Sequence, residues 1–142
     1  DSSIVQLCAT AFCNLSRDFF EQVVGSSCIN SIFTMLESED PVARTLSMKT
    51  VVNLLSQSRA EHNTLHLKAI NSLRKMTHMA KEDALMLELV LISLCILCHF
   101  PQNCKRITEP FIDPLSTSAA VGAAGDLGLF ATLDVEAVCA MA

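Results

Sequence analysis

The chain has 142 residues, of which 51% are hydrophobic and 5% aromatic, with no Trp or Tyr. This length allows one domain with a core of its own, while the shortage of aromatic residues and of turn-forming Gly and Pro argues against a β-sandwich or barrel. The net charge is −5, and the ten basic side chains are matched by ten acidic ones before residue 107, so the basic surface typical of a nucleic-acid-binding protein is not expected.

Apolar residues at helical spacing dominate the first 57 positions. They predict helices at residues 3–16, 19–24, 28–37 and 41–57. Gly25 is expected to end the second of these helices, because glycine accepts the backbone conformation that follows a helix. Asp40 is expected to cap the fourth helix, and Pro41 suits its first turn.

The same order of a short, a medium and a long helix recurs farther along the chain. The expected segments are helices at 62–67, 68–80 and 84–100, then 103–108 and 110–118, a small-residue loop at 116–128 and a last helix at 126–142. His66 stands where the first set has Gly25, so the short and medium helices are expected to join differently there.

Two sets of matching residues indicate an internal repeat. Ser-Cys-Ile-Asn-Ser-Ile-Phe at 27–33 matches Lys-Ala-Ile-Asn-Ser-Leu-Arg at 68–74, at an offset of 41 residues. Asp40, Asp83 and Asp126 each precede a helical pattern as an N-cap does, at an offset of 43 residues. A period of this length predicts an all-α solenoid, in which each unit buries its apolar face against the next.

Three helices per unit, with a glycine after the first, resemble the armadillo repeat family. The resemblance rests on Gly25, the helix at 28–36, the Asp40-Pro41 pair and the Val-Val-Asn-Leu-Leu string at 51–55. It implies a right-handed α-α superhelix, the armadillo-like solenoid, with about three repeats of 40–43 residues. Residues 1–108 would hold a third helix at 3–16 and repeats at 18–57 and 61–100, and residues 109–142 a degenerate or truncated terminal repeat. HEAT repeats, with two helices per unit, are the near alternative.

In that family, the resemblance implies, the third helices line a concave groove for an extended peptide, and an Asn on each of them binds the peptide backbone. Asn14 and Asn53 match that position, and an amide side chain offers the donor and acceptor that a peptide unit needs. The whole predicted groove consists of Gln6, Thr10, Asn14, Thr45, Lys49, Asn53, Glu88, Ile92, Ile96 and His99. It is polar and neutral on two helices, and apolar and acidic on the third. A merely solvated helix face is the alternative reading.

Two clusters have the spacing of ligand sites but favour a structural interpretation. The C-x-x-C-H string that begins at Cys95 fits a covalent haem site, yet Cys95 repeats the position of Cys13 in an earlier helix, which makes packing the simpler explanation. His62 and His66 are one turn apart without a third ligand. We therefore expect no metal, no cofactor and no enzymatic activity.

The function expected from these patterns is a non-enzymatic protein-interaction scaffold that binds an extended peptide or partner surface along the third helices. The alternative is a structural spacer within a larger regulatory, cytoskeletal or ciliary protein. We expect a protein or peptide partner, no nucleic acid, no membrane span, and a monomeric piece of a longer chain. The odd number of cysteines, seven, favours free thiols in a reducing compartment, the cytoplasm or the nucleus.

Overall fold

The computed structural model describes residues 2–109, in which all regular secondary structure is helical. The elements are α1 (Ser2–Asp18), α2 (Phe20–Gly25), α3 (Cys28–Met35), α4 (Pro41–Gln57), α5 (Asn63–Met79), the 3-10 helix η1 (Ala80–Glu82), α6 (Ala84–Cys98) and α7 (Pro101–Thr108). The all-α class is therefore confirmed for this part of the chain. The segments predicted at 110–118, 116–128 and 126–142, and with them the terminal repeat, lie outside the described residues.

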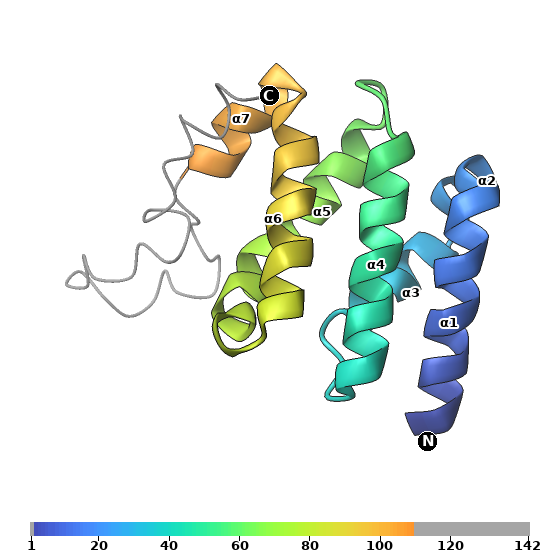
Figure 1. The fold of residues 1–142 in the computed structure, drawn as a ribbon. Helices are drawn as coiled ribbons and strands as arrows, with labels where there is room; N and C mark the ends of the chain where they lie inside the picture. The colour runs from blue at the N-terminus through green and yellow to red at the C-terminus, as the bar shows by residue number, and fades with distance from the viewer. Residues whose placement is uncertain (1, 110–142) are drawn as a thin grey trace, which may run out of the picture.

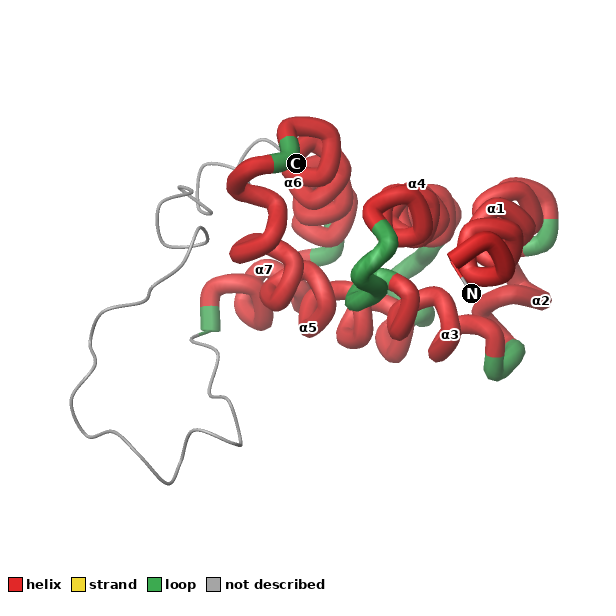
Figure 2. Tube along the Cα trace, turned by 90° about the horizontal axis from the view of Figure 1, so that it is seen from below, coloured by secondary structure: helices red, strands yellow, loops and turns green. Residues whose placement is uncertain are grey.

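The helices form two layers (Figures 1 and 2). In one layer α1, α4 and α6 lie side by side and run in the same direction, and α2, α3, α5 and α7 lie against one face of it. α4 is the middle helix, since it packs against both α1 and α6. The expectation that the three long helices line up beside one another is confirmed. The right-handed superhelix of armadillo repeats stays a prediction.

Aspartate caps begin two of these long helices, as the sequence predicts. Asp40 precedes α4, and its Oδ1 accepts hydrogen bonds from the N–H groups of Val42 at 2.9 Å and Ala43 at 3.0 Å. Asp83 precedes α6 and accepts one from the N–H of Met86 at 3.0 Å. Each cap satisfies N–H groups that have no partner within the helix, which stabilises the helix by about 1 kcal/mol.

One predicted break is wrong, because the helices expected at 62–67 and 68–80 form the single helix α5. Several other predicted helix ends differ from the structure by one or two residues. In the first unit the chain turns after Gly25, the last residue of α2. The corresponding place in α5 is occupied by His66, whose N–H donates to the carbonyl of His62 and continues the helix. His66 and Ala69 are both buried on the side that faces the core, so the helix gains packing by continuing.

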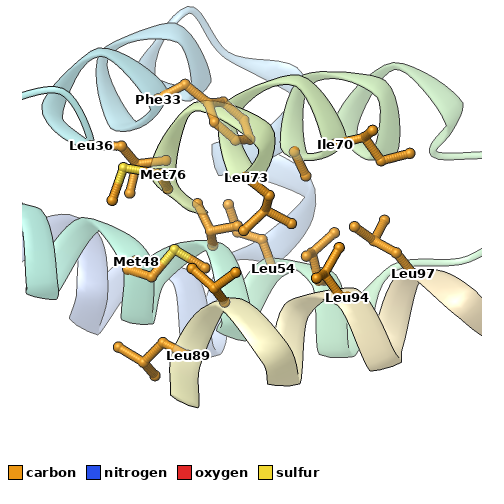
Figure 3. Close-up of a cluster of buried hydrophobic side chains, with 14 of the residues drawn as sticks. Phe33, Leu36, Met48, Leu54, Ile70, Leu73, Met76, Leu89, Leu94 and Leu97 are labelled. Atoms are coloured by element: carbon orange, nitrogen blue, oxygen red, sulfur yellow. The ribbon is translucent and has the colours of Figure 1, made fainter. Parts of the chain in front are cut away.

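The hydrophobic core lies between the two layers, as Figure 3 shows. Leu54 of α4, Leu73 of α5 and Leu97 of α6 are completely buried and come together there. Burying a leucine side chain contributes about 1.5–3 kcal/mol. Of the described helices, none covers the opposite side of the α1–α4–α6 layer. Within residues 2–109, no helix is both long and apolar enough to cross a membrane.

Candidate interaction surface

The predicted groove residues all belong to the α1–α4–α6 layer, and none of them is buried. α1 carries Gln6, Thr10 and Asn14; α4 carries Thr45, Lys49 and Asn53; α6 carries Glu88, Ile92 and Ile96, followed by His99 at its C-cap. Since the three helices run side by side in the same direction, residues with matching spacing come to one side of the layer. The structure thus brings the set to a common surface, although its members differ in what they contact.

Asn53 contacts the neighbouring helix instead of facing solvent as the groove prediction requires. Its Nδ2 donates to the Oγ of Ser16 at 3.1 Å and to the carbonyl of Cys13 at 3.3 Å, both on α1. Gln57 of α4 adds a third bond, from its Nε2 to the carbonyl of Ser16 at 2.7 Å. The donor side of the Asn53 amide is therefore used to join α1 to α4, whereas Asn14 is exposed on the outer side of α1.

Gln6 also holds two elements together. Its Nε2 donates to Oδ2 of Asp40 at 2.8 Å, and the hydroxyl of Ser2 donates to the same oxygen. The hydrogen bond from Ser2, the N–H of Ala43 and the bond from Gln6 lower the pKa of Asp40 to about 2. Gln6 thus links α1 to the start of α4, where Asp40 is the cap. The sequence pattern did not predict this link.

Two groove residues form hydrogen bonds within their own helices, and a third, Lys49, is exposed. The hydroxyl of Thr10 donates to the carbonyl of Gln6 at 2.8 Å, and that of Thr45 donates to the carbonyl of Pro41 at 2.9 Å, each within its own helix. Lys49 is exposed in the middle of the layer. Such bonds within a helix are common for threonine at surface positions, so these residues add polarity to the surface without joining its helices.

The same surface contains an open groove along α6. It has a volume of about 470 Å³ and is lined by Ala84, Leu87, Glu88, Leu91, Ile92, Cys95, Ile96 and His99. Four of these residues belong to the predicted groove, so the structure does bring the α6 members together. The other four, Ala84, Leu87, Leu91 and Cys95, were missed. The sequence did carry a sign of them, because apolar residues lie around most of α6. A helix that packs on one layer needs only one apolar side.

Aliphatic side chains form the groove, with polar groups at its side and end. Ile92 is 38% exposed, and Glu88 beside it is exposed as well. The Nδ1 of His99 donates to the carbonyl of Cys95 at 2.8 Å, so this nitrogen carries a proton and fixes the imidazole at the end of α6. Such a groove can bind apolar side chains and attract a cation.

The C-x-x-C-H string does not form a cluster of ligands. Cys95 is exposed, contrary to its predicted place in the core, while Cys98 is buried on another side of α6. The thiol of Cys104 on α7 lies 3.4 Å from the carbonyl of Cys98. Among the described residues, no three His, Cys, Asp or Glu side chains are placed to hold a metal ion.

The histidine pair takes part in hydrogen bonds within the fold. His66 is buried, with Nε2 2.9 Å from the hydroxyl of Ser58 and Nδ1 3.1 Å from the amide nitrogen of Asn103. Because the amide nitrogen of Asn103 only donates, Nδ1 accepts and Nε2 carries the proton. His62 accepts a hydrogen bond at Nδ1 from the N–H of Arg59 at 2.9 Å. These bonds explain the two histidines without a metal.

A second apolar surface lies at the opposite end of the layer, on the outer side of α1. Ile4 is 60% exposed and Leu7 69% exposed, although the helical spacing places both on the apolar side of the helix. Farther along the chain lies a hollow of about 380 Å³ that is lined by Phe12, Leu15, Phe19, Gln22, Val23, Ser26 and Cys28. Exposed apolar surface of this extent is typical of a surface that another element covers.

A scan against protein-family models, a search of curated proteins and a search of solved structures each gave no match.

Proposed function

We propose that this chain is a non-enzymatic interaction scaffold that binds an extended segment of a partner protein on the α1–α4–α6 layer. The observation that carries the proposal is the open apolar groove of α6, which contains Glu88, Ile92, Ile96 and His99 from the predicted set. Isolated exposed leucines are ordinary on protein surfaces, but a row of aliphatic side chains that forms a groove is typical of a binding site.

The chemistry of the groove indicates the kind of segment that it binds. Aliphatic side chains of the ligand would cover Ile92 and Leu91, and each Å² of apolar surface removed from water contributes about 25 cal/mol. A lysine or arginine of the ligand would lie near Glu88, which is exposed beside the groove. We therefore propose an extended partner segment that combines aliphatic residues with a basic residue.

Two exposed thiols support an intracellular place for this function. Cys8 and Cys95 are exposed and are not joined in a disulfide. Exposed thiols persist where the redox potential keeps cysteines reduced. We propose that the protein acts in the cytoplasm or the nucleus. We also propose that the two helical layers are part of an armadillo-like solenoid.

The test is a selection of random linear peptides, displayed on phage, against the whole chain, followed by affinity measurements on the enriched peptides. Ile92→Asp places a charge in the groove and is expected to weaken their binding at least about tenfold. Leu67→Asp is the matched control, because Leu67 is exposed to a similar extent, 46%, on α5 in the other layer. The proposal is wrong if no peptide is enriched, or if the enriched peptides bind the Ile92→Asp variant as tightly as the wild type.

A further inference from the structure

Residues at matching positions of α1, α4 and α6 differ in burial, because some are covered by a neighbouring helix and others are not. Asn14 on α1 corresponds to Asn53 on α4, and the residues three, seven and ten places before Asn53 lie on the side of α4 that faces α1. Those α4 residues, Thr50, Leu46 and Ala43, are buried or half-buried, and their α6 counterparts Ser93, Leu89 and Met86 are buried. The α1 counterparts Ala11, Leu7 and Ile4 are all exposed.

On the other side of each helix the order of exposure is reversed: the residue of α1 is buried and that of α6 is exposed. Cys13 is buried on the side of α1 that α4 covers. Val52, its counterpart on α4, is half-buried, and Cys95, its counterpart on α6, is exposed at the groove. α6 thus presents the side that α1 and α4 use to contact the next helix, without such a helix among the described residues.

We propose that these two surfaces bind each other in different copies of the chain. The outer side of α1, with Ile4, Leu7 and Ala11, would pack against the outer side of α6, with Leu91 and Cys95, of a second copy. The contact would continue the packing that joins α1 to α4 and α4 to α6 within one chain. We favour a second copy as the partner because each chain exposes both sides that such a contact needs, one on α1 and one on α6.

The proposed contact also includes a specific hydrogen bond. Within the chain, Asn53 donates to the carbonyl of Cys13. The corresponding pair across the contact is Asn14 of one copy and the carbonyl of Cys95 of the other. That carbonyl already accepts a bond from His99, and its second lone pair remains able to accept another. Exposed Asn14 would thus acquire between copies the partner that Asn53 has within one.

Two different surfaces meet in this contact, so association does not stop at a closed dimer. Each added copy leaves one α1 end and one α6 end uncovered, and the assembly grows with concentration. The proposed assembly differs from the monomer that the sequence predicts. The sequence alone does not reveal which apolar side of a helix is left exposed. The α6 half of the contact includes Leu91 and Cys95 of the groove, so a bound peptide would compete with a second copy there, whereas the α1 half, with Leu7, lies outside the groove.

The test is sedimentation velocity of the whole chain over a range of concentrations, with reducing agent present to exclude disulfide-linked species. The wild type is expected to reach sizes beyond a dimer. Leu7→Asp and Cys95→Glu each place a charge on one surface and are expected to weaken association at least about 100-fold, leaving monomers. Both side chains are exposed, so circular dichroism is expected to show an unchanged helical content. Ile4→Asp provides a second variant of the α1 surface, and Leu67→Asp is the control that still associates.

The decisive sample is an equimolar mixture of the Leu7→Asp and Cys95→Glu variants. Each variant retains the surface that the other has lost, so the mixture is expected to form a dimer and nothing larger. A wild type that stays monomeric at every concentration overturns the proposal. So does a wild type that stops at a dimer, or a mixture that remains monomeric.

Discussion

Asn53 of α4 donates a hydrogen bond to the hydroxyl of Ser16 on α1 over 3.1 Å, and Ser16 is completely buried. The Ser16 hydroxyl in turn donates to the carbonyl of Cys13 at 2.9 Å, within α1. A small polar network therefore joins the C-terminal halves of α1 and α4, where Gln57 of α4 also donates to the carbonyl of Ser16. The family resemblance implies that Asn53 binds a peptide, whereas the structure shows it joining α1 to α4. The effect of replacing Asn53 on stability distinguishes these two roles.

Replacing Asn53 with Ala is expected to lower the free energy of unfolding by about 1–3 kcal/mol, because the buried Ser16 loses a hydrogen-bond donor. Asn14→Ala, at the corresponding exposed position of α1, is the control and is expected to change it by less than about 0.5 kcal/mol. Urea unfolding followed by circular dichroism measures both, at a concentration low enough for monomers. Equal effects of the two substitutions would contradict a structural role for Asn53.

Asp40 is expected to make stability depend on acid. Its pKa is lowered from 3.8 to about 2, first by the hydrogen bond from Ser2 and then by Ala43 and Gln6. The unfolded chain therefore binds more protons between these values, so the contribution of Asp40 is complete above pH 3.8 and is lost as the pH falls towards 2. Asp40→Asn keeps an oxygen for the cap but does not titrate. Unfolding measured from about pH 5 downward is expected to show a smaller difference between wild type and variant at the acid end. A difference that stays constant would refute the role.

His66 is expected to make stability depend on pH in a higher range. Burial, with the nearby charges of His62 and Arg106, lowers its pKa below the ordinary value of 6.5. The unfolded chain then takes up a proton more readily, so the contribution of neutral His66 is complete above pH 6.5 and is lost as the pH falls below it. His66→Gln is expected to be less stable near neutral pH and to lack this part of the dependence.

The measurement for His66 is the midpoint of thermal unfolding between about pH 5 and 8, which brackets the ordinary pKa of histidine. His99→Gln is the matched control, because His99 is exposed at the end of α6. The control is expected to keep the wild-type dependence. If His66→Gln keeps it too, the dependence comes from another group.

Leu54 is expected to be among the most sensitive positions of the core. It is completely buried on α4 between the two layers, so Leu54→Ala leaves a cavity and is expected to cost about 2–5 kcal/mol. Leu67→Ala removes the same atoms from a side chain that is 46% exposed and is expected to cost far less. Urea midpoints of the two variants compare them directly, and similar midpoints would place Leu54 outside the core.

Local chemistry explains which parts of the fold were predictable from the sequence. Asp40 and Asp83 were recognised as caps, because a capping carboxylate acts within three residues of its own position. The long helices followed from apolar spacing for the same reason. α5 was divided wrongly, because the boundary was inferred from the short helix before Gly25, and burial of His66 favours a continuous helix.

The surface was less predictable, since exposure depends on the neighbours of a helix as well as on its own spacing. Leu7 belongs to an apolar side, which predicts burial, yet nothing among the described residues covers it. Asn53 looks like a surface residue in the sequence, and only the placement of α1 shows its partners. Cys95 shares the spacing of Cys13, but it lies on the last long helix of the described layer and is exposed.

The central position of α4 has a consequence for how the molecule opens. α4 is the one long helix of the described layer with a packed neighbour on both sides, whereas α1 and α6 each have one. Opening at either end therefore breaks fewer contacts than opening in the middle. Amide hydrogens of α4 are expected to exchange with deuterium last and those of α1 and α6 earlier, so that protection against exchange declines from the centre of the layer towards both ends.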